Sequence, residues 1–224
     1  PRYSLRARNN EFAKLDVLEQ GIKEAHERNK KFFLTVNTLP HNSKLKTFVA
    51  DMEPLIAMKP DALIMADPGL IMTVREKWPE MPIHLSVQAN TTNYWGVKFW
   101  QNIGVERIIL SRELSMEEIA EIRQECPDIE LEVFIHGALC IAYSGRCLLS
   151  GYFNHRDPNQ GTCTNSCRWD YKVHNAVESD AGDAQLLQGF NFEKAQEEAN
   201  QNFEGINGQK RHPYADKVFL IEES

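Results

Sequence analysis

The sequence predicts an α/β fold, and two observations support this. Apolar runs of strand length alternate along the chain with segments that carry helix signals. The runs are hydrophobic at nearly every position, which is typical of parallel strands covered on both faces. Repeated β-α units of this kind build either a TIM-type (β/α) barrel or a doubly wound sheet. The five runs are residues 32–36, 62–65, 83–87, 107–110 and 131–135.

Helix start signals fall between these runs. Ser115 and Glu118 have the spacing of a capping box, in which each side chain accepts a hydrogen bond from the other residue's backbone N–H. The helix that they open is expected to end near Glu125, because a proline follows closely. Asp67, which directly precedes a proline, and Asn93 are the expected starts of two further helices.

Composition and charge narrow the class of protein. With 224 residues and 42% hydrophobic content, the chain can bury a full core. It contains neither an apolar run long enough to span a membrane nor the apolar segment of a signal peptide, so we expect a cytoplasmic protein. A net charge of −7 argues against a protein that coats nucleic acid. Six arginines either dock a polyanion or carboxylate locally or are solvated surface residues: Arg2, Arg6, Arg8, Arg146, Arg156 and Arg168.

Four of the five cysteines lie within 28 residues. Cys140 and Cys147 are separated by six residues, Cys163 follows after fifteen more, and Cys167 after another three. In a reducing cytosol such a cluster favours a metal or redox site over disulfides. Four thiolates can hold either a zinc ion or an iron–sulfur cubane, and buried structural cysteine is the alternative for any single thiol. Cys126 lies outside the cluster, and we interpret it as structural.

Polar residues follow most of the predicted strands. The carboxyl ends of the strands in a barrel converge on one mouth, so these side chains are expected to surround a single polar site. The alternative is that they only begin loops. No GxGxxG phosphate loop is present, which disfavours dinucleotide binding. The strand-end residues are Asn37, Asp67, Gln88, Asn90, Ser111, Arg112, Glu113 and His136.

The character of the sequence changes after Tyr171. Acidic and amide-rich sequence extends over residues 172–212, which we interpret as an insertion or mobile linker after a core of residues 1–171. Residues 213–224 contain one more apolar run, interpreted as a further barrel strand or the start of a C-terminal region. A barrel needs eight strands and six candidates are evident, so the chain is expected to be part of a longer protein.

Several segments closely resemble a known family. Residues 132–140, with Gly145-Arg146-Cys147 and Leu149-Ser150, match the signature of the collagenase-like peptidase family. Residues 84–90, 110–114 and 161–169 resemble the branch of that family implicated in tRNA hydroxylation. The family's opening strand, with its Ser-Pro-Ala-Gly turn, and its C-terminal region have no counterpart here. The resemblance therefore implies a TIM-type barrel that is incomplete at its N-terminus and carries a cysteine-bearing loop region.

The resemblance also implies an activity. Members of this branch are implicated in prephenate-dependent hydroxylation of the wobble uridine of tRNA to 5-hydroxyuridine, and related members bind a four-iron four-sulfur cluster through four cysteines. The ligands here would be Cys140, Cys147, Cys163 and Cys167. Arg112 and His136 are the expected catalytic residues, with Arg112 also holding a dicarboxylate such as prephenate. The expected substrate-binding residues are Asn37, Asp67, Gln88, Asn90, Arg112 and Tyr143.

Two other functions remain as alternatives. The family's name suggests a peptidase, in which Cys140 and His136 would form a thiol–imidazole pair, but neither an HExxH nor a GxSxG motif is present. A non-catalytic scaffold is the other alternative. Tyr143 and Trp169 either stack a base or fill space around the cluster.

Overall fold

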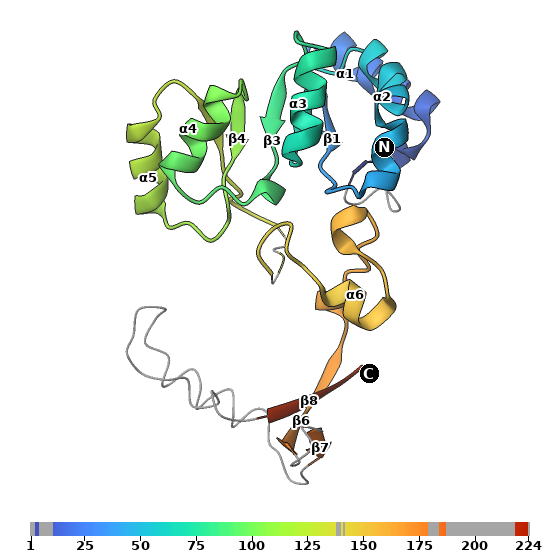
Figure 1. Ribbon diagram of the computed structural model, residues 1–224, viewed down its shortest axis with the longest axis vertical. Coiled ribbons are helices and arrows are strands. Elements are labelled where there is room, and N and C mark those ends of the chain that lie inside the picture. The colour runs from blue at the N-terminus through green and yellow to red at the C-terminus, as the bar shows by residue number, and fades with distance from the viewer. Residues whose placement is uncertain are drawn as a thin grey trace. The chain divides into compact units, whose positions relative to one another are not determined.

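The computed structural model describes residues 3, 4, 11–137, 140, 142–178, 184–186 and 218–223. The chain divides into two compact units, Pro1–Cys167 and Arg168–Ser224. Figure 1 shows the helices and strands of both units. Within the described residues, no helix is both long and apolar enough to cross a membrane.

A five-stranded parallel sheet forms the centre of the first unit. Its strands run in the order β1-β2-β3-β4-β5, so that each strand lies beside the next one in the sequence. The predicted α/β fold is confirmed. This sequential order is that of neighbouring strands in a (β/α) barrel, and it contains no reversal of the kind that defines a doubly wound sheet. The strands are Phe33–Val36, Ala62–Met65, Ile83–Leu85, Arg107–Ile109 and Glu130–Glu132.

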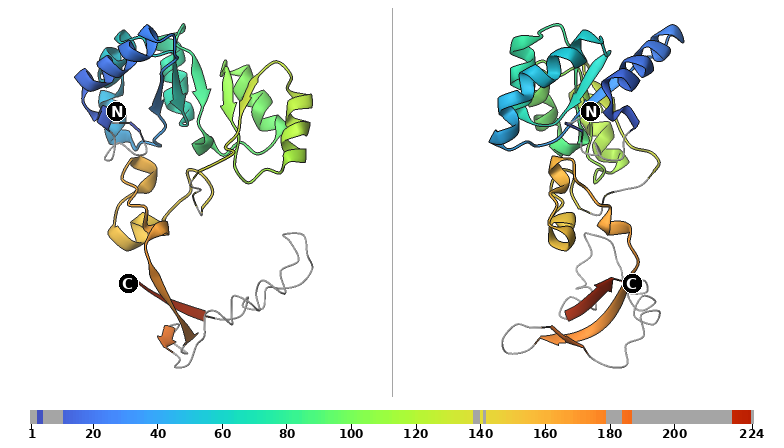
Figure 2. Two further views of the ribbon diagram at one scale, coloured as in Figure 1. Left: turned by 180° about the vertical axis from the view of Figure 1, so that it is seen from behind. Right: turned by 90° about the vertical axis from the view of Figure 1, so that its right-hand side faces the viewer.

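One helix lies between each pair of successive strands, as Figure 2 shows from two sides. The side chains of Asp67, Asn93 and Ser115 cap three of these helices, and Ser115 forms the predicted capping box with Glu118. All three predicted helix starts are confirmed. The helices are α1 (Leu15–Glu27), which precedes the sheet, α2 (Asn42–Ala57), α3 (Pro68–Lys77), α4 (Tyr94–Asn102) and α5 (Met116–Glu125).

The two faces of the sheet differ in chemistry. One face carries apolar residues such as Leu34, Leu63 and Leu85, which belong to the same buried cluster as Met52 of α2 and Val74 of α3. Burial of this face against the helices provides the main driving force for folding of the unit. On the other face one register row crosses all five strands and turns from neutral to charged: Thr35, Ile64, His84, Arg107 and Glu130.

The last predicted strand of the sheet is shorter than expected. β5 ends at Glu132, and the apolar residues that follow it are exposed, with Ile135 at 93%. β5 is an edge strand of the described sheet, so β4 is its one ladder partner. The ladder ends where the Leu110 N–H donates to the Glu132 carbonyl at 2.9 Å.

The second unit holds an antiparallel sheet in the order β7-β6-β8. The strands are β6 (Tyr171–Glu178), β7 (Ala184–Leu186) and β8 (Val218–Glu223). The apolar run predicted within 213–224 does form a strand, but it pairs with β6 rather than joining the parallel sheet. β6 falls in the segment that we interpreted as an insertion, and its alternation of apolar and polar residues is partly hidden by histidine and asparagine. Residues 179–183 and 187–217 lie outside the described residues.

Candidate functional site at the carboxyl ends of the strands

Small polar side chains join the carboxyl ends of three strands. The Asn37 amide, after β1, donates to the Ser86 hydroxyl after β3 at 3.2 Å. The Ser111 hydroxyl, after β4, donates to the side-chain amide oxygen of Asn90 at 2.9 Å and also contacts Glu113. Ser86 and Ser111 are both buried, so these hydrogen bonds satisfy hydroxyls that are removed from water. Four of the predicted strand-end residues, Asn37, Asn90, Ser111 and Glu113, therefore take part in hydrogen bonds at these strand ends.

The turn after β3 gives this network its shape. The Ser86 hydroxyl also accepts a hydrogen bond from the Gln88 N–H at 3.3 Å and so caps the short 3₁₀ helix Val87–Ala89. Asn90 ends that helix in the left-handed conformation, with φ 53°, which asparagine adopts more readily than most residues. This conformation brings the Asn90 side chain into contact with Ser111.

The segment between the first two cysteines is attached to these strand ends. The Arg112 Nη2 donates to the hydroxyl of the buried Ser144 at 2.8 Å, and its guanidinium carbon lies 5.5 Å from the ring centroid of Phe134. Gly145 adopts φ +73° and lies against Gln88, whose carbonyl oxygen would be only 2.5 Å from a Cβ atom at this position. Only glycine fits this backbone conformation and this close approach.

A second set of hydrogen bonds attaches the residues around Asn159 to the part of the chain that follows β1. The Leu39 N–H donates to the Asn159 carbonyl at 3.1 Å, and the Lys44 ammonium donates to the Gln160 carbonyl at 3.0 Å. The Asn159 amide in turn donates to the Cys147 carbonyl at 3.1 Å. The backbone of Cys147 is therefore linked through Asn159 to the loop that follows β1.

Buried hydroxyls organise the segment that carries the last two cysteines. Ser150 of α6 (Leu149–Asn154) accepts a hydrogen bond from the Thr164 N–H at 3.1 Å. The Thr164 hydroxyl contacts the Asn154 amide oxygen at 2.9 Å and the Ser166 hydroxyl at 2.6 Å. Thr164 directly follows Cys163, and Ser166 directly precedes Cys167, so this cluster fixes the backbone beside both thiols.

The four clustered cysteines are free thiols. Cys140 is exposed, whereas Cys147, Cys163 and Cys167 are partly buried. Among the described residues, no group of three or more histidine, cysteine or carboxylate side chains is arranged to hold one metal ion. The donor set nevertheless fits zinc or an iron–sulfur cluster, because both take four thiolates and no thiol here is committed to a disulfide.

Cys126 differs from the other cysteines. It is 3% exposed, belongs to the hydrophobic core and contacts the Tyr94 carbonyl through its Sγ at 3.7 Å. Burial raises the pKa of the Cys126 thiol, which keeps it protonated and unreactive. The structural interpretation of Cys126 agrees with this environment.

Other predicted site residues lie apart from the network. The Asp67 carboxylate accepts a hydrogen bond from the Leu70 N–H at 2.9 Å and acts as the cap of α3. His136 is exposed, and no hydrogen bond joins it to Arg112 or to Cys140. Tyr143 is 57% exposed. Trp169 belongs to the second unit, and Arg2, Arg6 and Arg8 lie outside the described residues.

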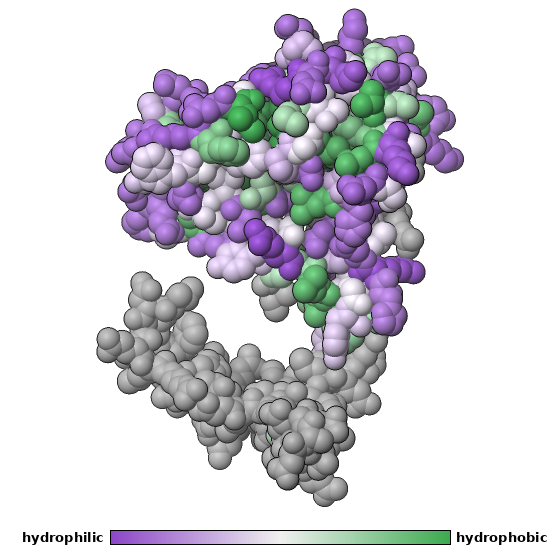
Figure 3. Space-filling view, viewed as in Figure 1, coloured by the Kyte–Doolittle hydropathy of each residue, from purple (hydrophilic) through white to green (hydrophobic). Residues whose placement is uncertain are grey.

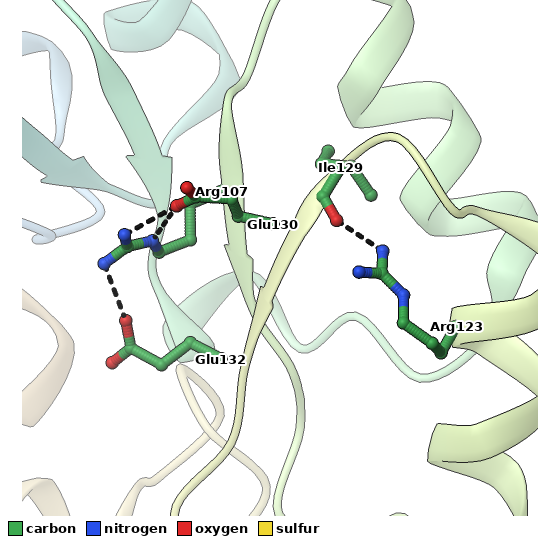
Figure 4. Close-up of polar contacts among 5 residues, drawn as sticks. All are labelled: Arg107, Arg123, Ile129, Glu130 and Glu132. Atoms are coloured by element: carbon green, nitrogen blue, oxygen red, sulfur yellow. Dashed lines mark hydrogen bonds and ion pairs between the residues drawn. The ribbon is translucent and has the colours of Figure 1, made fainter.

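The amino ends of the strands hold a cavity of about 390 Å³. Arg107 reaches from β4 to both Glu130, at 2.5 Å, and Glu132, at 3.4 Å (Figure 4). The hydrogen bond and the charge of Arg107 hold the pKa of Glu130 below its ordinary value. Burial, followed by the charge of Arg107, lowers the pKa of His84 to about 4. His84 and Glu130 line the cavity together with Lys31, Phe33, Glu106 and Asp128.

Figure 4 also shows Arg123 pointing toward the Ile129 backbone. Its guanidinium donates to the Ile129 and Cys126 carbonyls and so fixes the loop between α5 and β5. Over the face drawn in Figure 3, hydrophilic and hydrophobic residues of the first unit are interspersed rather than segregated. The surface alone therefore does not single out one site.

The fold and the site together define a class of protein: a parallel α/β unit with cysteine-bearing loops attached to the carboxyl ends of its strands. Residues 1–211 match the model of Peptidase family U32, and the chain belongs to this family.

Relatives carry different names. The tRNA hydroxylation protein P of Escherichia coli (strain K12) is 59% identical over 224 residues, which are 100% of this chain and 47% of that protein. The 23S rRNA 5-hydroxycytidine C2501 synthase of the same organism is 34% identical over 167 residues, which are 75% of this chain and 25% of that protein. A solved structure of a U32 peptidase is 16% identical, with a TM-score of 0.45 over 51% of this chain and 49% of that one. The chain spans about half the length of the tRNA hydroxylation protein.

Sequence reasoning missed Ser86, Ser144 and Asn159. Each forms a hydrogen bond to a residue outside its own local segment, and Asn37 and Ser86, for example, are 49 positions apart. Serine and asparagine are common in loops, so nothing in their local sequence distinguishes a buried hydrogen-bonding role. The one available signal is that Ser144 directly precedes a glycine between two of the clustered cysteines.

Proposed function

We propose that this chain is the cysteine-bearing part of an enzyme that hydroxylates the wobble uridine of tRNA to 5-hydroxyuridine, with prephenate as co-substrate. The observation that carries the proposal is the 59% identity, over the whole chain, to a tRNA hydroxylation protein. A relative named for hydroxylation of a cytidine in ribosomal RNA supports the same chemistry on a pyrimidine base. A tRNA substrate would place the enzyme in the cytoplasm.

Cys140, Cys147, Cys163 and Cys167 would hold a four-iron four-sulfur cluster. The support for this part is that all four are free thiols, that three are partly buried, and that the backbone beside Cys147, Cys163 and Cys167 is held by hydrogen bonds. When bound, such a cluster supplies electron transfer or an iron site that activates a ligand.

The chain's own residues would bind and orient the substrates. The Arg112 guanidinium has five N–H donors, and the bond to Ser144 leaves others for a carboxylate of a dicarboxylate such as prephenate. The exposed Tyr143 offers a ring on which a base can stack, and the exposed His136 offers an imidazole for proton transfer. Asn37, Gln88 and Asn90 supply amide groups at the same strand ends.

The test is made in the organism that carries the protein. Its gene is deleted in a strain without redundant enzymes, and wobble nucleosides are measured by mass spectrometry. We expect 5-hydroxyuridine derivatives to disappear, and to return with the wild-type protein and with Cys126→Ser, but not with Cys163→Ser. Unchanged nucleosides in the deletion strain would contradict the proposal.

The cofactor is tested separately. Anaerobically purified protein is analysed for iron and acid-labile sulfide, with single Cys→Ser variants at the four clustered positions and at Cys126. Full cluster content after loss of one clustered cysteine would remove that residue from the ligand set. Cleavage of gelatin that survives iron removal but is abolished by Cys140→Ala would instead support a thiol peptidase, because a nucleophile needs a free thiolate.

A further inference from the structure

We infer that Arg112 is a positioning residue, which holds the Tyr143–Cys147 segment against the carboxyl ends of β3 and β4 and thereby fixes where Cys147 lies. The inference deepens the proposed function, since it concerns the order of a cysteine that would ligate the cluster. Its evidence is nevertheless independent of any metal, because it rests on contacts among the chain's own residues.

The first contact is the hydrogen bond from Arg112 to Ser144. Ser144 is 2% exposed, and Arg112 donates to its hydroxyl at 2.8 Å across 32 residues of sequence. Without that donor a hydroxyl oxygen would remain buried and unsatisfied, a state that folded proteins avoid. Loss of Arg112 therefore favours release of Ser144 to solvent, together with the residues attached to it.

The orientation of Arg112 is fixed independently of Ser144. Its guanidinium lies over the ring of Phe134, with 5.5 Å between the guanidinium carbon and the ring centroid. A planar guanidinium can stack flat on a ring and donate at its edge at the same time, whereas a lysine ammonium lacks the planar fork that allows both in this arrangement. This predicts that lysine replaces arginine incompletely at this position.

Gly145 provides a second contact between the same two parts of the chain. It approaches the Gln88 carbonyl so closely that a Cβ atom would lie 2.5 Å from the oxygen. Gly145→Ala is therefore expected to push the segment away from the turn after β3 without changing the Arg112 or Ser144 side chain. It provides an independent way to release the segment.

The effect of releasing the segment should be local. The Arg146 N–H donates to the Tyr143 carbonyl at 3.0 Å, so residues 143–146 form one turn that moves as a unit. Cys147 directly follows this turn. Cys163, in contrast, is held through the neighbouring Thr164, whose bonds to Ser150 and Asn154 do not involve Arg112.

The test measures thiol reactivity in full-length, reduced, metal-free protein under anaerobic conditions. Each cysteine is alkylated with iodoacetamide, and its rate is followed by peptide mass spectrometry. We expect Arg112→Ala to raise the rate at Cys147 by about tenfold, the size of effect expected from losing a hydrogen bond to a charged group. The rate at Cys163 should change less than about twofold, because the bonds that hold its neighbour Thr164 share no partner with Arg112 and sites without shared partners behave independently. Arg112→Lys should give an intermediate rate at Cys147.

Further variants make the result specific. Ser144→Ala and Gly145→Ala should each raise the Cys147 rate, and Arg112→Ala combined with Ser144→Ala should match Arg112→Ala alone, because both remove the same bond. Arg156→Ala is the matched control, since it removes an exposed arginine of the same region and should leave the Cys147 rate unchanged.

Two results would overturn the inference. An unchanged Cys147 rate in Arg112→Ala would show that Arg112 does not hold the segment. Equal acceleration at all the cysteines would show general unfolding. Because the protein in this assay contains no iron, the alkylation rates test the role of Arg112 independently of the proposed tRNA chemistry.

Discussion

At the carboxyl ends of the parallel strands the hydrogen-bonded network is built mainly from small, neutral side chains, whereas the amino ends carry charged ones. Asn37, Ser86, Asn90 and Ser111 join the carboxyl ends by hydrogen bonds. At the amino ends, Arg107 and Glu130 form an ion pair, and both residues line a cavity. The hydrogen bonds that attach the cysteine-bearing segments to the parallel α/β unit lie on the side of the carboxyl ends.

The difference between the two ends shows that the position of a cavity need not be the position of the functional site. A large pocket with charged residues and a shifted histidine pKa is the usual first choice for an active site. In parallel α/β folds, however, both barrels and open sheets bind their ligands at the carboxyl ends of the strands. We therefore assign the amino-end charges to stability, and each prediction below either tests that assignment or measures its size.

The largest expected effect is on activity. In the full-length protein, Cys147→Ser should lower tRNA hydroxylation by at least about 100-fold, since even residues that only support a metal ligand commonly contribute 10–100-fold. Glu106→Gln and Asp128→Asn change exposed carboxylates of the amino-end cavity. The activity of each variant should stay within about threefold of wild type, because the chemistry is expected at the opposite, carboxyl ends of the strands. Nucleoside mass spectrometry of tRNA treated in vitro gives the rates. A loss in Glu106→Gln as large as that in Cys147→Ser would move the site to the cavity.

The next effect is on stability and comes from His84. Its side chain is 6% exposed, and its Nδ1 is buried with no hydrogen-bond partner among the described residues. Burial, with the charge of Arg107, lowers the pKa of His84 from 6.5 to about 4, so the unfolded chain binds a proton more readily than the folded one between these two values. The free energy of unfolding should therefore be highest above pH 6.5 and fall by on the order of 1–3 kcal/mol as the pH falls to about 4.

Urea unfolding at a series of pH values measures this loss. His84→Gln should flatten the dependence between pH 4 and 6.5, and His155→Asn, at an exposed histidine, should leave it unchanged. If His84→Gln retained the full dependence, other groups would have to be responsible.

The strands and helices that carry the site could be predicted because their signals are local. The runs 62–65 and 107–110 and the caps at Asp67 and Ser115 are visible within a few residues of sequence, and the structure confirms them. The partner of β8 could not be predicted in this way. Its pairing with β6 joins segments more than forty residues apart, and no local pattern specifies such a contact.

The site was predictable in composition more than in arrangement. Cysteine spacing identified four candidate ligands, and the ends of the apolar runs identified Asn37, Asn90 and Arg112. The role of Arg112 as the partner of Ser144 depends on a contact across 32 residues, which the sequence does not encode locally. The cluster and the substrate roles of these residues stay predictions.

A substitution of Asp67, at the carboxyl end of β2, is expected to have a smaller effect on stability. Its carboxylate caps α3, so Asp67→Ala should lower the free energy of unfolding by about 1 kcal/mol. Asp67→Ser should recover most of that loss, because a serine hydroxyl caps a helix nearly as well. Urea denaturation measures both variants. If Asp67 also binds substrate, Asp67→Ser will restore stability and still raise the KM for the dicarboxylate, which would extend the site as far as the β2 end.

The smallest effect is expected from the ion pair between Arg107 and Glu130. The Glu130 side chain is 66% exposed, and exposed pairs contribute little because water and salt screen them. Since the hydrogen bond and charge of Arg107 lower the pKa of Glu130, the stabilisation should be present above the ordinary pKa of 4.5 and be lost as the pH falls through the lower folded value. Glu130→Gln should therefore be slightly less stable than wild type at pH 7, and the difference should shrink as the pH falls below 4.5. A difference that stayed constant as the pH was lowered would come from packing of the Glu130 side chain rather than from its charge.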